Sequence, residues 1–385
     1  MTDIRTAYWT RRHLDRLTES PATTAPVIGP GTPYRVLPDH DIWDAWPVQE
    51  EDGSVTVAGG TELWMALSAP AAGHPEGRHD HARIRLLGRT AGDSWTDLGP
   101  VFADGASLGS REWSGSAVHR PDGTVSIFYT AAGERGEARP TFRQRVVEAR
   151  PRLSEAGGAI RLDRHAGHRE VVRSDGRTYL LADERTGGPG RIRAFRDPGW
   201  FRDPADGREY LLVAASVPER NRFTGAIALA AATDDGWSLR PPLLVADGIN
   251  HEIERPHIVV HQSRYHLFFC TSRGSFHPPG AAPSGLYGFV APALTGPYEP
   301  LNGSGLVLQN PPTQPDQAYA WLVLPDLRVV SFLNYRAGNG TDPRRAGTAE
   351  ARTRFGGTLA PVLDLVLAPD GAPAHRTSLR SGRLL

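Results

Sequence analysis

The chain has 385 residues, and 43 basic residues balance 43 acidic residues to a formal net charge of zero. A neutral chain without a basic tract is not expected to bind nucleic-acid backbones. All of its basic residues are arginine, which excludes Schiff-base catalysis and a lysine-containing phosphate loop. No apolar run approaches the ~20 residues of a membrane-spanning helix, and the single cysteine, Cys270, excludes an internal disulfide.

The first residues form a polar segment rich in threonine and proline. We expect residues 1–37 to be a leader packed on the main body, with Trp9 as its anchor, and residues 38–385 to form one catalytic domain. The chain does not begin with the apolar segment of a secretory signal. We therefore expect the protein in the cytoplasm, or outside the cell by a route that uses no secretory signal. The sequence leaves the oligomeric state open.

From residue 41 onward, a two-part pattern recurs five times. Each unit opens with a polar or acidic cluster and leads, through turn-forming residues, into an apolar strand. The clusters and their strands lie at 43–46 and 63–67, 112–116 and 125–129, 195–198 and 210–214, 252–255 and 265–269, and 318–320 and 329–333. Such repetition is typical of repeat folds, and four-stranded units favour a propeller. We predict an all-β, five-bladed β-propeller.

Further strands of the blades are visible in part. Third strands are predicted at 82–88, 227–231 and 286–291. Residues 135–190 are rich in arginine and glycine with weak periodicity, so we expect long loops there, around the mouth of the channel. Because blades are arranged radially, the starts of the five first strands approach one central channel. Side chains from distant segments can therefore meet in one pocket.

Three carboxylates open predicted first strands: Asp44, Asp197 and Glu254. We interpret them as occupying equivalent positions of the repeat. Cleavage of a glycoside with retention needs two carboxyl groups roughly 5–5.5 Å apart, one as nucleophile and one as acid and then base. A third acid can hold substrate hydroxyls and stabilise developing positive charge. Flat apolar walls for a sugar ring are offered by Trp43, Trp46 and Trp113.

Each acid also has an ordinary structural interpretation. Asp44 would be a turn cap, and Asp197, which precedes a proline, would only begin a strand. Glu254 would form an ion pair with its neighbour Arg255. The occurrence of all three at the starts of repeat units favours the functional interpretation.

The triplet Arg-Asp-Pro occurs twice, at 196–198 and at 202–204. The second copy runs directly into Ala-Asp-Gly, which is typical of a hairpin turn. A turn between the first and second strands lies at the far end of the blade from the start of the first strand. We therefore assign Asp197 to the site and Asp203 to the turn.

Together these motifs resemble glycoside hydrolase family 68, the levansucrase and bacterial β-fructofuranosidase group. The matching segments are 42–47 (IWDAWP), 112–117 (EWSGSA), 195–198 (FRDP), 252–257 (EIERPH) and 286–290 (LYGFV). The resemblance implies a five-bladed propeller, in agreement with the repeat count. It also implies a retaining enzyme that takes sucrose or a similar β-fructoside, releases glucose and passes the fructosyl unit to a fructan, another sugar or water.

The resemblance implies a role for each matched position. Asp44 would be the nucleophile that forms a fructosyl-enzyme, and Glu254 would be the acid/base. Asp197, together with Arg196, would hold the fructosyl hydroxyls. The fructosyl pocket would be lined by Trp43, Trp113 and Ser114, and the glucose side of sucrose would face Glu252, Arg273 and Tyr319. For Arg273, a solvated loop arginine is the alternative interpretation.

Two features of the chain depart from the family pattern. Secreted Gram-positive relatives carry an acid before the EIER motif that helps bind calcium, whereas this chain has His251, a poor ligand for a hard cation. We expect no metal and no cofactor. The outer segments that set product length are short or diverged, which leaves the acceptor and the linkage open.

Three rival functions stay open. They are a mainly hydrolytic β-fructofuranosidase, a transferase for another β-fructoside or an unusual acceptor, and a non-catalytic sugar-binding propeller. The last predicts the loss of one of the three acids, and all three are present.

Overall fold

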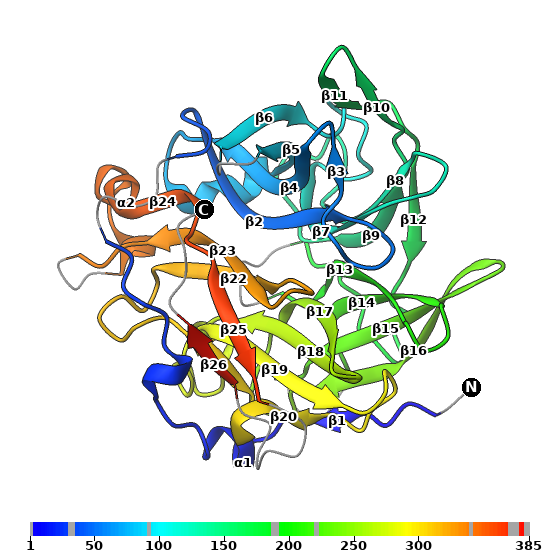
Figure 1. Ribbon diagram of the computed structural model, residues 1–385. Helices are drawn as coiled ribbons and strands as arrows, with labels where there is room; N and C mark the ends of the chain where they lie inside the picture. The colour runs from blue at the N-terminus through cyan, green and yellow to red at the C-terminus, as the bar shows by residue number, and fades with distance from the viewer. Residues whose placement is uncertain are drawn as a thin grey trace.

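The computed structural model describes residues 3–29, 35–90, 94–185, 192–218, 223–338, 342–368 and 377–380. Its strands form five radial units, which confirms the predicted all-β, five-bladed propeller (Figure 1). The innermost strands contact one another in a closed ring around the central channel: β2 (His40–Gln49), β7 (Arg111–His119), β13 (Phe195–Arg202), β17 (Glu254–His261) and β22 (Ala318–Val323).

The first two blades share one sheet, because β2 and β7 pair in parallel where Val48 lies opposite Ala117. Outward from β2, blade one contains β4 (Thr61–Pro70), β5 (Arg83–Thr90) and β6 (Ser94–Pro100), with β3 (Val57–Ala58) paired to β4. Outward from β7, blade two contains β8 (Val125–Ala132), β9 (Gln144–Ala149) and β12 (His168–Val172).

The segment 135–190 was expected to be long loops, and this is wrong in the part where four strands interrupt it. It supplies β9 and β12, and a separate hairpin of β10 (Leu153–Ala156) and β11 (Ala159–Leu162). The strands are short, and only a few of their side chains, such as Val146 and Val147, are fully buried. The periodicity of such short strands is too weak to detect in the sequence. Residues 186–190 lie outside the described part of the chain.

The remaining blades follow the same plan. Blade three contains, after β13, β14 (Glu209–Ser216), β15 (Gly225–Thr233) and β16 (Gly236–Val245). Blade four contains, after β17, β18 (Arg264–Thr271), β19 (Gly285–Ala291), β20 (Glu299–Pro300) and β21 (Leu306–Gln309). Blade five contains, after β22, β23 (Arg328–Tyr335), β24 (Phe355–Leu359), β25 (Leu363–Leu367) and β26 (Thr377–Arg380).

Helices are few and short. The α-helices are α1 (Arg11–Leu14) and α2 (Thr348–Arg354), and the 3₁₀ helices are Pro21–Thr23, Pro75–His81, Arg273–Ser275, Leu301–Gly303 and Pro343–Arg345. No helix among the described residues has the length and apolar character needed to cross a membrane. The 3₁₀ helices at 75–81, 273–275 and 343–345 matter for function, because each lies beside the channel mouth.

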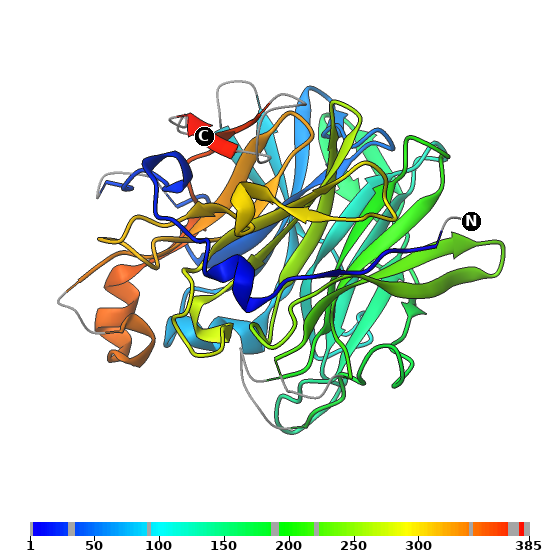
Figure 2. The ribbon, with the colours of Figure 1, turned by 90° about the horizontal axis from the view of Figure 1, so that it is seen from below.

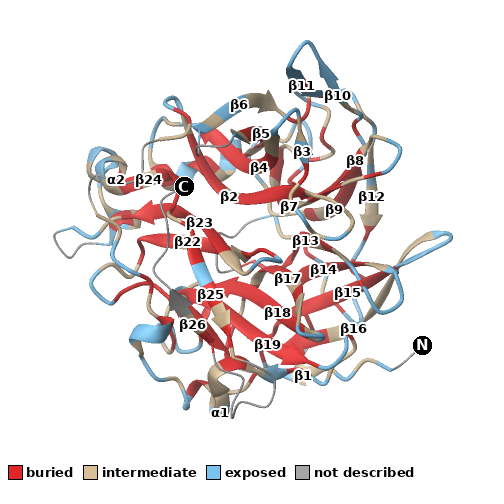
Figure 3. Cartoon of the chain, viewed as in Figure 1, coloured by how far each residue is buried: buried red, intermediate tan, exposed pale blue. Residues whose placement is uncertain are grey.

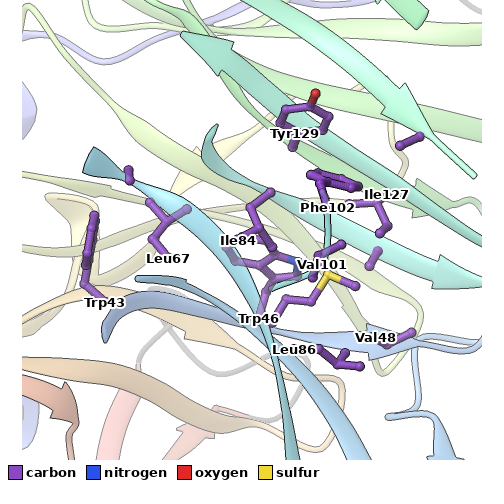
Figure 4. Close-up of a cluster of buried hydrophobic side chains, with 14 of the residues drawn as sticks. Trp43, Trp46, Val48, Leu67, Ile84, Leu86, Val101, Phe102, Ile127 and Tyr129 are labelled. Atoms are coloured by element: carbon purple, nitrogen blue, oxygen red, sulfur yellow. The ribbon is translucent and has the colours of Figure 1, made fainter. Parts of the chain in front are cut away.

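The hydrophobic core lies mainly between neighbouring blades. Burial is concentrated on the inner and middle strands, and exposure is concentrated on the connecting loops and on the β10–β11 hairpin (Figure 3). The largest cluster joins blade one to blade two, where Trp46 packs with Ile84 and Val101 (Figure 4). Because apolar contact stabilises roughly in proportion to the buried area, this interlocking fixes the blades relative to one another.

The leader crosses the outside of blades three and four (Figure 2). Its first strand, β1 (Ala7–Tyr8), pairs in parallel with β16. Trp9 is fully buried against four aromatic rings of blade four and its connecting loop, with centroid distances of 4.9–6.3 Å. Its indole N–H donates to the Ser304 carbonyl at 2.9 Å. Trp9 therefore fastens this segment to blade four, and the division of the chain at residue 37 stays a prediction.

Candidate active site

Each inner strand has an irregular register near the point where it enters the channel mouth. The ladder shifts between residues 43 and 46 in β2, 113 and 115 in β7, 196 and 199 in β13, 254 and 257 in β17, and 319 and 322 in β22. Four residues inside these bulges have positive φ: Asp44 (49°), Asp197 (55°), Arg255 (51°) and Ala320 (56°). This backbone region is uncommon for residues other than glycine, and such outliers often occur at functional sites.

The bulges explain how one strand presents two consecutive side chains to one cavity. In a regular strand consecutive side chains point to opposite faces, but a bulge sets two residues against one. The residues that precede the irregular positions are Trp43, Trp113, Arg196, Glu254 and Tyr319. The residues that follow them are Asp44, Ser114, Asp197, Arg255 and Ala320. All ten side chains line the same cavity, whose volume is about 590 Å³.

This register corrects one part of the sequence interpretation. Asp44 and Asp197 do occupy equivalent positions, but the equivalent residue in blade four is Arg255, and Glu254 lies one position earlier. Glu254 is thus equivalent to Trp43 and Arg196. The three acids still converge, because the bulge directs both positions into the cavity. A one-residue difference of this kind depends on strand pairing, which the spacing of the motifs does not reveal.

Asp44 is held by a hydroxyl from the next blade. The Ser114 hydroxyl donates to Asp44 Oδ2 at 2.6 Å. Burial raises the pKa of Asp44, while the Arg255 guanidinium and the hydrogen bond from Ser114 oppose that rise, and the Glu254 charge adds to it. This short hydrogen bond orients the carboxylate within the cavity that both residues line.

Asp197 is nearly enclosed by protein. Its backbone N–H donates to the Thr130 hydroxyl at 2.9 Å, and its Oδ2 accepts from the Arg255 backbone N–H at 3.3 Å. Burial raises the pKa of this carboxyl to about 7, against the opposing charge of Arg196 and with further increases from Glu254 and Asp44. Three acids in one enclosed space thus make ionisation of Asp197 expensive.

Glu254 is more open than Asp197, since their side chains are 27% and 8% exposed. Its Oε2 accepts from the Tyr319 hydroxyl at 2.6 Å, and its Oε1 accepts from Arg196 Nη2 at 3.2 Å. The same Arg196 nitrogen contacts Glu252, which is buried and whose pKa burial raises. The buried Arg196 charge is therefore offset by several carboxylates, as a buried ion requires.

The comparisons with known proteins agree with this geometry. The family model described as Levansucrase/Invertase matches residues 1–225 and 219–381. The chain belongs to this family of glycoside hydrolases. The resemblance found in the sequence is therefore confirmed.

Individual relatives match this chain over nearly its whole length. Levansucrase LscA of Pseudomonas savastanoi pv. glycinea is 31% identical, over 94% of this chain and 92% of the relative. A levansucrase of Rahnella aquatilis is 32% identical, over 93% and 92%. The structure of an inulosucrase from Halalkalicoccus jeotgali bound to kestose superposes with a TM-score of 0.90 at 36% identity, covering 98% of this chain and 96% of that one.

Of the ten residues to which the family resemblance gives a role, nine line the 590 Å³ cavity and Arg273 does not. Arg273 lies in the 3₁₀ helix Arg273–Ser275, and its side chain is 47% exposed. Its Nη2 contacts Asp316 Oδ2 at 3.4 Å, and Asp316 does line the cavity. Arg273 is therefore outside the cavity lining and contacts one of the acids that line it, Asp316.

Arg255 is a site residue that the sequence reasoning assigned no role. Its guanidinium donates to the Ala320 carbonyl at 2.5 Å and to the Ala45 carbonyl at 2.7 Å. It therefore ties blade four to blades five and one across the channel. The repeat carries a signal for it, since Arg255 occupies the position of Asp44 and Asp197 once the bulges are aligned.

The 3₁₀ helix Pro75–His81 is a second part of the site that the sequence reasoning missed. The Arg78 guanidinium carbon lies 5.4 Å from the centre of the Trp43 ring. The carbonyl of His79 accepts from the Trp113 indole N–H at 3.4 Å. One short insertion in blade one therefore holds both tryptophans that the family resemblance assigns to the fructosyl pocket. A seven-residue 3₁₀ helix has no periodicity by which it could have been found.

A second cavity, of about 560 Å³, lies at the far end of the channel. It contains Asp203 and Trp46 among its lining residues, whereas neither lines the mouth cavity in the described structure. Trp46 packs into the core between blades one and two, while Trp43, three residues earlier, lies apart beside Leu67 (Figure 4). The idea that Trp46 supplies a wall for the sugar is therefore wrong.

The described residues contain no group of three or more histidine, cysteine, aspartate or glutamate side chains arranged to hold a metal ion. Cys270 is buried, with its Sγ 3.1 Å from the Trp321 carbonyl, and burial raises its pKa. A buried thiol with a raised pKa is a poor nucleophile. The cavity lining also supplies carboxylates, hydroxyls and guanidinium groups, such as those of Asp44, Ser114 and Arg255.

Proposed function

We propose that this protein is a retaining fructosyltransferase, which cleaves sucrose and passes the β-fructosyl unit to a fructan, another sugar or water. One observation carries the proposal: Asp44 and Glu254 face one cavity in two different settings. Asp44 accepts a hydrogen bond from Ser114, and Glu254, whose side chain is 27% exposed, accepts from Tyr319 and Arg196. Curated relatives named levansucrases and a structurally similar inulosucrase support the same reaction class.

In the first half-reaction, a carboxylate oxygen of Asp44 attacks the anomeric carbon of the fructosyl unit. The bond from that carbon to the bridging oxygen breaks, and Glu254 gives its proton to this oxygen, so that glucose leaves as a neutral molecule. The product is a covalent ester between the fructosyl unit and Asp44. Glu254 is left as a carboxylate.

In the second half-reaction, an acceptor hydroxyl enters from the mouth of the cavity. Glu254 takes the proton of this hydroxyl while its oxygen attacks the anomeric carbon, and the ester bond to Asp44 breaks. Both carboxyl groups return to their starting states. Two successive inversions give net retention at the anomeric carbon.

The other residues of the cavity hold and stabilise the fructosyl unit. Asp197 and Arg196 lie on the same strand at the bulge of β13, next to the reacting carboxylates, where they can bind the sugar hydroxyls. The negative charges around the cavity favour the positive charge that develops on the ring in the transition state. Trp43 and Trp113 supply apolar walls, fixed in place by the insertion at residues 75–81.

The proposal is tested by incubating the purified protein with sucrose and measuring glucose, fructose and product size. We expect glucose release that exceeds fructose release, with the missing fructose recovered in larger products. Equal amounts of glucose and fructose would assign the protein to the hydrolytic alternative. If no glucose appears from sucrose, but another β-fructoside is cleaved, the transferase for a different donor would replace our proposal.

A further inference from the structure

We propose that Arg344 is a sugar-binding residue on the glucose and acceptor side of the cavity, and that Asp316 is its positioning residue. This inference rests on the proposed function, because it names a specificity determinant of the same site. Arg344 belongs to the 3₁₀ helix Pro343–Arg345, in the connection between β23 and α2 of blade five. Its side chain lines the 590 Å³ cavity.

Asp316 bridges two arginines from different blades. Its Oδ1 accepts from Arg344 Nη2 at 3.0 Å, and its Oδ2 is 3.4 Å from Arg273 Nη2. The Asp316 side chain is only 10% exposed, so the carboxylate has little freedom to move. One buried acid therefore fixes both guanidinium groups at the rim between blades four and five.

Arg344 also packs against the aromatic ring of Tyr335. Its guanidinium carbon lies 5.7 Å from the centre of the Tyr335 ring, and the Tyr335 hydroxyl donates to Glu76 at 2.8 Å. Burial lowers the pKa of Arg344, but the charges of Asp316 and Glu76 outweigh burial and raise this pKa overall. A guanidinium held by acids and an aromatic ring is preorganised, so it loses little conformational entropy when it binds a ligand.

The held guanidinium retains donors for a ligand. A guanidinium has five N–H donors, and those of Arg344 contact only Asp316 and, at 3.5 Å, Asp342 among the described residues. The side chain is 34% exposed, compared with 8% for Asp197. Arg344 therefore lies in the outer part of the cavity, where its free donors can reach the hydroxyls of a sugar.

The position on the rim assigns Arg344 to the glucose and acceptor side. The fructosyl unit must lie against Asp44 and Asp197 at the base, so the leaving glucose extends toward the mouth. An incoming acceptor sugar occupies the same place after glucose has left. Water needs no such support. Loss of Arg344 therefore weakens sucrose binding and transfer to sugars, while transfer to water continues.

The test compares Arg344→Ala with the matched control Arg345→Ala. Arg345 is the next residue of the same helix, but its side chain is 88% exposed and its described ion pair, at 4.0 Å, is with Asp342. We expect Arg344→Ala to raise the KM for sucrose about ten-fold, which corresponds to one hydrogen bond from a charged group. We also expect it to raise the ratio of free fructose to glucose, and Arg345→Ala to change neither.

Two further variants separate sugar binding from folding. Arg344→Lys keeps the charge but not the fork of donors, so it should restore only part of the KM. Asp316→Asn frees both arginines and should raise the KM at least as much as Arg344→Ala, with kcat changed less than KM. If wild-type protein releases glucose from sucrose and Arg344→Ala matches it in KM and product ratio, this inference is wrong. If wild-type protein releases no glucose, the proposed function fails first and the inference fails with it.

Discussion

The two copies of the Arg-Asp-Pro triplet lie at opposite ends of β13 and have opposite fates. At the mouth, Asp197 sits in a β-bulge with a φ of 55°, beside two further carboxylates of the cavity. At the far end, Asp203 follows the strand and caps the turn, accepting from the Ala205 N–H at 2.9 Å and from the Tyr265 hydroxyl at 2.5 Å. Asp197 is crowded by acids, whereas Asp203 is satisfied by donors.

This difference teaches that the triplet itself carries no function. What decides is the strand position, because a bulge at the mouth brings Asp197 toward Asp44 and Glu254 while a turn directs Asp203 into a second cavity. An acid whose ionisation is disfavoured by burial and by neighbouring acids, such as Asp197, costs folding free energy. An acid satisfied by neutral donors contributes to stability instead. The two ends should therefore respond to mutation in opposite ways.

The largest expected effect is the loss of turnover at the mouth. Asp44→Asn removes the nucleophile and Glu254→Gln removes the acid/base, so each should lower kcat for sucrose by about three orders of magnitude or more, with the fold intact. Initial rates of glucose release and circular dichroism measure the two quantities. Asp203→Asn should keep nearly full activity. If either mouth variant kept about a tenth of the wild-type rate, its assigned role would be wrong.

The next effect is on stability, and it should have opposite signs at the two ends. In the folded protein the pKa of Asp197 is about 7, above its ordinary value of 3.8. Between these pH values the folded state keeps a proton that the unfolded state has lost, so the unfolding free energy falls as pH rises through this window. Asp197→Asn removes this cost, and its gain over wild type should grow from pH 4 to pH 7, to at most about 4 kcal/mol.

Denaturant unfolding at pH 5 and pH 8 measures this gain in unfolding free energy. The same variant should lose activity, because the fructosyl hydroxyls lose a partner.

Asp203→Ala provides the opposite case. It removes the acceptor for Tyr265 and for the turn, so it should lower the unfolding free energy by about 1–3 kcal/mol at both pH values and leave KM unchanged. Equal activity losses in both variants would show that the two ends are not functionally distinct.

A smaller effect is expected at the rim, where Arg273 extends from blade four. If Arg273 faces the glucose side, Arg273→Ala should raise KM for sucrose by roughly ten-fold and increase free fructose relative to glucose. Arg344 lines the mouth cavity and Arg273 does not. The Arg273 side chain is also more exposed, at 47% compared with 34% for Arg344. Unchanged KM and product ratio would support the solvated-loop interpretation of Arg273.

The fold and the acids of the site were predictable because the repeat carries them. Asp44, Asp197 and Glu254 each lie in the first half of an inner strand, and radial symmetry brings these parts of the inner strands together. The exact position of Glu254 was not predictable, since the bulge register in β17 depends on pairing with β18. The same limit hid the role of Arg255, which shares the bulge position of two acids.

Three residues outside the repeat, Arg78, Asp316 and Arg344, were not predicted. Arg78 and Arg344 lie on 3₁₀ helices inserted between strands, and Asp316 lies in the connection between blades four and five. Such segments have no period, and their partners are up to hundreds of residues away, as with Tyr335 and Glu76. Trp46 was misassigned for a related reason, because a strand alternation interrupted by a bulge does not reveal which side faces the channel.

The smallest expected effect is that of metal removal. The sequence analysis predicts no calcium site, because His251 precedes the EIER motif and an imidazole is a poor ligand for a cation that prefers oxygen. The contacts argued above at both ends of the channel are hydrogen bonds and ion pairs within the chain, so we predict that neither end depends on a cation. We expect EDTA to leave both the melting temperature and the rate of glucose release unchanged. A melting temperature that falls with EDTA and returns with calcium would contradict this, and would point to oxygen ligands other than the position now held by His251.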